Sequence, residues 1–223
     1  TAPLQQAKNV GRALAVAQEA LAKGIAPLVP GSTEQQLACA NLAAEAAGGV
    51  STPAIQDAAW VTSTAHPWRR DGDGTVRAGD LVALSAGVLA DGYVAEIART
   101  VYVGEPTEAV RALYRRRDSL WQHLIEACRP GNTTGALLDA YERAGEPLPA
   151  MPVAHGLGLG FDPPVVTPHL RATAQHDLLE EGMVLALTAY VWRQGVGAVF
   201  TRDAVVIRAD GPEVLTEFPA GLG

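Results

Sequence analysis

Residues 79–104 read GDLVALSAGVLADGYVAEIARTVYVG, and this stretch decides the fold. Its apolar and partly β-branched runs predict two strands, at residues 81–86 and 93–103. Asp91-Gly92 lies between the two strands, and this dipeptide is a strong signal for the tight turn of a β-hairpin. We therefore expect an antiparallel hairpin here.

Two polar side chains belong to this hairpin: Ser85 near the end of its first strand and Glu96 in its second. The alternation of side chains along a strand can bring such residues to one face. A carboxylate on a half-buried hairpin needs a partner, because burying an unpaired charge costs free energy. The rest of the chain must therefore supply a partner for Glu96.

The composition is that of a globular protein with a substantial core, and it argues against several classes of function. The chain has 223 residues, 48% of them hydrophobic, and a net charge of -7, which fits one large domain or two fused halves. Its basic residues are scattered except at 69–70 and 115–117, which argues against a nucleic-acid surface. No apolar run reaches the roughly 20 residues of a membrane helix, and residues 1–10 lack a signal-peptide pattern. Cys39 and Cys128 lack metal-motif spacing, so we expect helix-face thiols in a reducing cytoplasm.

Outside the hairpin, the spacing of apolar residues predicts two helical pairs and further strands. Ser32 or Thr33 caps the second helix, and Gly48-Gly49 ends it. The expected helices are 4–23, 34–47, 107–129 and a shorter one ending near Ala144; strand fragments and a polar loop occupy 51–78, and strands follow the polar segment 165–179 at about 183–192 and 197–208.

Three passages recur in order, at offsets of roughly 100 residues. A repeated order of helix, helix, strand and strand predicts two halves around a pseudo-twofold axis that share one sheet. Ser85 would then face Thr188, and Glu96 would face Arg202. The recurring passages are PGST at 30–33 with PGNT at 130–133, GDLVALSA at 79–86 with GMVLALTA at 182–189, and, more weakly, EIARTV at 96–101 with RDAVVI at 202–207.

The chain resembles the methionine aminopeptidase, prolidase and creatinase superfamily from Pro30 to its final strand. The resemblance implies the pita-bread fold of the α+β class, with two pseudo-twofold-related αβ halves around a shared curved antiparallel sheet. It also implies a single domain, 1–223, with pseudo-repeats at about 4–106 and 107–216 and without the separate N-terminal domain of prolidases and creatinase. The passages that carry the resemblance are 79–107, AHGLGLGFDPP at 154–164, LEEGMVLALTAY at 179–190 and FTRDAVVIRADGPEVLT at 200–216.

The departures from this family concern its metal site. Family peptidases hold two metal ions with two aspartates, a histidine and two glutamates, and the resemblance places these positions, in order, on Ser85, Glu96, His155, Thr188 and Arg202. Three ligands are therefore lost, and Arg202 is a fixed cation that repels a divalent ion. Glu96 and His155 alone are too few for a hard dinuclear site. We therefore predict that the chain binds neither these metals nor another cofactor.

The partner expected for Glu96 is Arg202, and two interpretations of the pair stay open. It is either a structural salt bridge or a pair that holds the charged ends of a substrate. His155 precedes Gly156, in a passage that we interpret as a turn with little side-chain cover. His155 is either a general acid/base or a structural histidine left over from the metal site.

The other candidates are expected to line the same pocket. By the resemblance, His66 matches an upstream pocket histidine, and Phe161 falls near the position of a further family histidine. A nucleophilic pair of Ser85 and His155 is disfavoured, because no Gly-x-Ser-x-Gly surrounds Ser85. The expected site comprises catalytic His155, His66 and Glu96, with substrate contacts from Arg202, Ser85, Thr188, Trp68, Arg69, Phe161 and Tyr190.

Two classes of function follow from the resemblance and its departures. The first is a metal-independent enzyme that acts on a small amino-acid-like or amide-like molecule by histidine acid/base chemistry, as creatinase does within this family. The second is a catalytically inactive module that binds a peptide or protein partner. A mononuclear metallo-aminopeptidase ranks last. We expect a small-molecule substrate, no nucleic-acid or membrane partner, and pairing as a homodimer.

Overall fold

A computed structural model describes residues 2–50, 53–55, 57–159 and 161–222. Its strands form a single antiparallel sheet in the order β1-β2-β3-β7-β6-β4-β5, and β8 pairs with the outer part of β7. The elements are α1 (Ala2–Ile25), α2 (Glu34–Ala47), β1 (Ala59–Val61), β2 (Leu81–Ala90), β3 (Tyr93–Tyr102), α3 (Glu108–Ala127), α4 (Gly135–Arg143), β4 (Ala154–Leu157), β5 (Phe161–Val166), a 3-10 turn (Pro168–Leu170), α5 (Arg171–Ala174), β6 (Val184–Arg193), β7 (Gly197–Arg208) and β8 (Gly211–Val214).

The predicted hairpin is formed by β2 and β3, which pair along their full length from Leu81 opposite Tyr102 to Ala90 opposite Tyr93. Asp91 and Gly92 connect the strands with φ angles of 51° and 83°. Both angles are positive, as a tight hairpin turn that matches the twist of the strands requires. The first strand continues four residues beyond the predicted end at Ala86, because Gly87 to Ala90 remain paired with β3.

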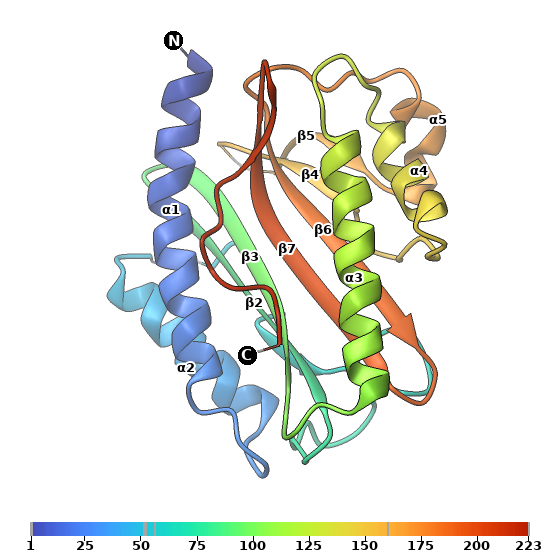
Figure 1. Ribbon diagram of the computed structural model, residues 1–223. Coiled ribbons are helices and arrows are strands. Elements are labelled where there is room, and N and C mark those ends of the chain that lie inside the picture. Colours follow the sequence, from blue (N-terminus) through green and yellow to red (C-terminus); the bar gives the residue numbers. More distant parts are fainter. Residues whose placement is uncertain (1, 51–52, 56, 160, 223) are drawn as a thin grey trace.

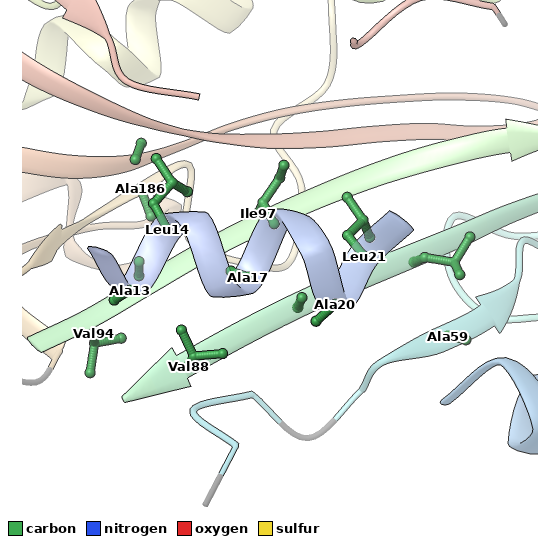
Figure 2. Packing of buried hydrophobic residues seen from close by; sticks show 14 of the residues in the cluster. Ala13, Leu14, Ala17, Ala20, Leu21, Ala59, Val88, Val94, Ile97 and Ala186 are labelled. Atoms are coloured by element: carbon green, nitrogen blue, oxygen red, sulfur yellow. The ribbon is translucent and has the colours of Figure 1, made fainter. Parts of the chain in front are cut away.

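Helices α1 and α3 lie on the same side of the sheet, and the C-terminal segment runs between them (Figure 1). Small residues on α1, such as Ala13, Ala17 and Ala20, are fully buried and let the helix approach the hairpin closely. Figure 2 shows this face of α1 beside Val88 and Ile97. The opposite side of the sheet carries a smaller cluster that includes Trp60, Ala98 and Phe200.

The sequence repeat reappears as matching backbone hydrogen bonds in the two halves. The amide of Gly31 donates to Val76, and the amide of Gly131 donates to Leu179 in the same way. Other pairs match too: Gly79 with Val103 and Gly182 with Ile207, Val76 with Ser32 and Leu179 with Asn132, and Ser85 with Ala58 and Thr188 with Val153. The same turns and the same backbone hydrogen bonds at the strands therefore occur twice, as the repeated passages predicted.

The two halves join in the sheet between β3 and β7. Ala98 opposite Arg202 is the register pair of this junction. Beside it, the Thr100 hydroxyl donates to the carbonyl of Phe200 at 3.1 Å and accepts from its amide at 2.8 Å. A side chain thus takes the place of a backbone partner where the strands diverge.

The helix predictions agree closely with the structure, whereas the short strands were missed. The expected helix 34–47 coincides with α2, and its Thr33 cap accepts from Gln36 in a capping box. The sequence did not predict β4, β5 or β8. Consequently the interpretation of His155 as a turn residue is wrong, because His155 lies in β4 with neighbours on both sides.

Two further observations concern the exposure of the cysteines and the length of the helices. Cys39 is exposed on α2, and Cys128 is buried at the end of α3. Within the described ranges, no helix combines the length and the hydrophobicity needed to cross a membrane.

Candidate functional site

The central strands place polar side chains in one row across the sheet. Ser85 on β2 lies opposite Ala98 on β3, Ala98 lies opposite Arg202 on β7, and Arg202 lies opposite Thr188 on β6. Directly opposed residues of antiparallel strands share a face. Glu96 is two residues from Ala98 and therefore points to the same side. Ile97, which follows Glu96, packs toward α1 (Figure 2), so the row faces away from the helices.

Glu96 is the centre of this row and has cationic or hydrogen-bonding partners at both oxygens. Arg202 donates from Nη1 to Oε2 at 2.5 Å, and His155 Nε2 lies 3.3 Å from Oε1. Arg202 also donates from Nε to the hydroxyl of Thr188 at 3.1 Å. His155 reaches the row because it pairs with Ala186, two residues before Thr188, next to a β-bulge after His155.

The environment of Glu96 keeps its carboxylate charged although the side chain is only 1% exposed. Burial alone would raise the pKa of Glu96. The hydrogen bonds and charges of His155 and Arg202 lower it by more, so the net pKa lies below the usual range. The pair expected from the sequence between Glu96 and Arg202 is therefore present and charged on its acidic side.

A cavity of about 380 Å³ opens beside this row. Its wall combines Arg202 and Ser85 with aromatic rings. The Trp60 ring stacks on the Trp68 ring with centroids 5.7 Å apart, and the Phe200 ring lies 5.6 Å from Trp60. The lining residues are Ala54, Ile55, Asp57, Trp60, Trp68, Ser85, Met151, Phe200 and Arg202.

The structure separates Ser85 from Thr188, which the repeat had placed face to face. Ala98 and Arg202 stand between them in the row. Ser85 instead donates its hydroxyl to the carbonyl of Asp57 at 2.5 Å, and Thr188 accepts from Arg202. The two hydroxyls therefore hold the cavity wall and the guanidinium.

The remaining predicted residues lie around the cavity at different depths. Trp68 belongs to its wall and is 41% exposed. Arg69 pairs with Asp57 at 3.1 Å and with Glu34 at 3.7 Å. The His66 imidazole, 45% exposed, lies 3.5 Å from Asp71 and is absent from the cavity's described lining.

Two of the expected substrate contacts occupy other environments. Tyr190 is buried behind Phe200, with ring centroids 6.4 Å apart, and burial raises the pKa of its hydroxyl. Within the described ranges that hydroxyl has no hydrogen-bond partner. Phe161 begins β5, and its side chain lies outside the described part of the structure.

Sequence reasoning missed six lining residues: Trp60, Phe200, Asp57, Met151, Ala54 and Ile55. A signal existed for Phe200, because it precedes Arg202 by two residues on a predicted strand and so shares its face. Trp60 required the pairing of β1 with β2, which places it opposite Ala83, two residues before Ser85. Nothing local in the sequence marks Asp57 or Met151.

Comparison with known proteins identifies the class to which this fold and site belong. The profile of Metallopeptidase family M24 matches residues 8–209, and the chain belongs to this family. The family resemblance and the pita-bread fold expected from the sequence are thereby confirmed.

The similar proteins are peptidases by name. The chain is 31% identical over 163 residues to the putative dipeptidase YkvY of Bacillus subtilis, covering 70% of this chain and 44% of that protein. It is 26% identical to the Xaa-Pro dipeptidase of Pyrococcus furiosus, covering 96% of this chain and 62% of that protein. The crystal structure of the prolidase from Pyrococcus horikoshii OT3 superposes with a TM-score of 0.84 at 23% identity, covering 98% of this chain and 64% of that one. The chain thus spans less than two thirds of the length of these relatives.

The family name implies metal ions, and the residues of this row do not fit them. Glu96 and His155 are side chains of types that bind metals, and each already contacts the other. The second oxygen of Glu96 is bonded to Arg202, a permanent cation that disfavours a divalent ion beside it. Within the described ranges, no group of three or more His, Cys, Asp or Glu residues could hold a metal ion.

Proposed function

We propose that this chain is a metal-independent hydrolase of the M24 family that cleaves a C–N bond in a small amino-acid-like or amide-like molecule. Membership of a peptidase family supports the reaction class. The absence of a fitting ligand set supports a mechanism that uses the chain's own residues, with His155 as acid/base, His66 assisting and Glu96 as the stabilising carboxylate.

The observation that carries the proposal is the contact of Glu96 with His155 on one side and Arg202 on the other. In the proposed reaction, His155 takes a proton from water while the water oxygen attacks the carbonyl carbon. The same proton then passes to the nitrogen that leaves when the C–N bond breaks. Glu96 remains ionised, because its pKa is held low, and it stabilises the positive charge on His155 between these steps.

The experiment uses purified protein stripped with EDTA, with its metal content measured. It is incubated with a panel of dipeptides, including Xaa-Pro dipeptides, and N-acyl amino acids, and released amines are detected by mass spectrometry. We expect turnover without metal that is lost in His155→Ala and kept in His123→Ala, since His123 lies half-exposed on α3. Activity that appears only after a divalent metal is added contradicts the proposal.

A second candidate is a binding module without chemistry, and one observation favours it. Arg202 and Ser85 line the cavity, whereas His155 and Glu96 are absent from its described lining. A ligand that fills this cavity would then contact the guanidinium but not the imidazole. Saturable binding with no release of product from any bound compound would select this candidate.

A further inference from the structure

Arg202 has one nitrogen left for a ligand. Its Nε and Nη1 are engaged by Thr188 and Glu96, while Nη2 has no hydrogen-bond partner within the described ranges. The side chain is 12% exposed, and it lines the cavity. Because Nη1 and Nε are fixed by neighbours, the guanidinium plane is already oriented, and a ligand that binds Nη2 meets a rigid donor.

The part of the cavity wall next to the charged Arg202 is apolar and aromatic. Trp60 and Phe200 are almost fully buried, and they support the exposed ring of Trp68 from behind. The carbon of the Arg202 guanidinium lies 5.3 Å from the Phe200 ring centroid, so the charged and aromatic parts of the wall are contiguous. The cavity volume of about 380 Å³ lies in the range of small-molecule sites.

The charged group in the cavity wall besides Arg202 does not oppose an anion at Nη2. Asp57 is the carboxylate in the described lining, and Arg69 already neutralises it at 3.1 Å. A guanidinium forms its strongest hydrogen bonds with carboxylates. A flat apolar group fits beside the indole of Trp68, because aromatic groups stack favourably.

We propose that this cavity binds a small organic carboxylate with a flat apolar group, whose carboxylate contacts Arg202 and whose flat group packs against Trp68. The inference deepens the proposed function, because it names the class of molecule that this site would take. It requires no reaction, however, and can be tested with a compound that contains no C–N bond.

The test compares 3-phenylpropionate with its neutral amide, 3-phenylpropionamide, and with butyrate, which lacks the ring. Binding is followed by calorimetry and by tryptophan fluorescence, with Trp121→Phe removing a tryptophan outside the cavity as a control. We expect the acid to bind about tenfold more tightly than the amide, and more tightly than butyrate by a similar factor. Equal affinity for acid and amide, or no binding of the acid, overturns the proposal.

Variants of Arg202 and Trp68 test separately the proposed contact of each residue with the ligand. The double variant Glu96→Gln/Arg202→Gln leaves no unpaired buried charge, and it should abolish the preference for the acid over the amide. Trp68→Ala changes an exposed ring and should weaken 3-phenylpropionate several-fold while leaving butyrate unchanged. A preference for the acid that persists in the folded double variant contradicts the role of Arg202. Binding of the acid without turnover of any amide would overturn the proposed hydrolase but not this inference.

Discussion

Glu96 is a fully buried acid that stays charged because two neighbours compensate it. The cost of removing a carboxylate from water is large, and it is offset here by a guanidinium at 2.5 Å and an imidazole at 3.3 Å. The compensation is mutual, because Arg202 is itself only 12% exposed. Each partner therefore depends on the other, and single and double substitutions should behave very differently.

Replacing Arg202 alone should be severely destabilising. In Arg202→Met the carboxylate of Glu96 keeps only the contact with His155, and we expect a loss of ~3–5 kcal/mol in the free energy of unfolding. The double variant Glu96→Gln/Arg202→Met removes both charges and should recover more than half of that loss. Urea unfolding measures both variants. Equal stability of the single and double variants would mean that the pair is not coupled.

The residues around Glu96 lead to a prediction about metal. We expect the wild-type protein to bind no divalent ion stoichiometrically, because Arg202, a permanent cation, is bonded to Glu96. The variant Ser85→Asp/Glu96→Asp/Thr188→Glu/Arg202→Glu restores the ligand types that the family resemblance implies, and it should bind Mn²⁺. Elemental analysis and calorimetry test both statements. Stoichiometric metal in the wild type would contradict the first.

For individual residues, the sequence predicted the contact between Glu96 and Arg202 because equivalent positions of a repeat converge. It failed for Ser85 and Thr188, since convergence brings them into one row but not into contact. The stacking of Trp60 on Trp68 depends on a three-residue strand, β1, whose pairing no local pattern specifies.

Among the elements, α2 presents polar side chains to the back of β2. Asn41 donates from Nδ2 to the carbonyl of Ser85 at 2.8 Å, and Glu45 lies one turn further along, beside Gly87. Within the described ranges, Oδ1 of Asn41 and Oε2 of Glu45 have no hydrogen-bond partner. Burial raises the pKa of Glu45 to about 7, against a smaller lowering by the backbone of Gly87.

The raised pKa of Glu45 makes the stability of the chain depend on pH. An acid with a higher pKa in the folded state contributes fully below its unfolded pKa, and its contribution is lost as the pH rises through the folded value. The window therefore runs from about 4.5 to about 7. Between these limits we expect Glu45→Gln to gain roughly 3 kcal/mol relative to the wild type.

Urea unfolding of both proteins at pH 4.5 and pH 8 measures this difference. The exposed Glu19→Gln on α1 serves as the control and should differ from the wild type by the same amount at both pH values. A constant difference between Glu45→Gln and the wild type would show that Glu45 does not titrate in this window.

The success of sequence reasoning for elements follows the locality of the signal. The start of α2 is specified by Thr33 and Gln36, which are three residues apart in sequence and hydrogen-bond each other. The strand β4 is only four residues long, AHGL, and it exists because β5 and β6 pair with it from both sides. Such a strand has no periodicity of its own, and this explains why His155 was assigned to a turn.

For the whole molecule, the C-terminal segment connects the two halves on the helical side of the sheet (Figure 1). Gln18 of α1 accepts from the amides of Glu217 and Phe218 at 2.8 and 3.0 Å. From the other half, Arg117 of α3 donates to the carbonyl of Ala220 at 2.6 Å. Between them, Arg99 of β3 donates to the carbonyls of Phe218 and Pro219.

Removing this segment should therefore weaken the whole fold and not only its end. In a chain truncated after Thr216, the buried guanidiniums of Arg99 and Arg117 lose carbonyl acceptors, although Arg99 keeps its hydrogen bond to Asp203 at 2.6 Å. Each unsatisfied buried donor costs about 1–3 kcal/mol, so we expect a loss of at least about 3 kcal/mol in the free energy of unfolding.

A shorter truncation separates the effect of these carbonyls from the effect of chain length. A chain that ends at Ala220 keeps every carbonyl bound by Arg99 and Arg117, and it should lie within about 1 kcal/mol of the full chain in urea unfolding. Because the segment contacts α1, β3 and α3 together, its loss should lower the midpoint of a single transition seen equally by fluorescence and circular dichroism. Two separate transitions after truncation would instead mean that the halves unfold independently, and that the segment is what makes them one cooperative unit.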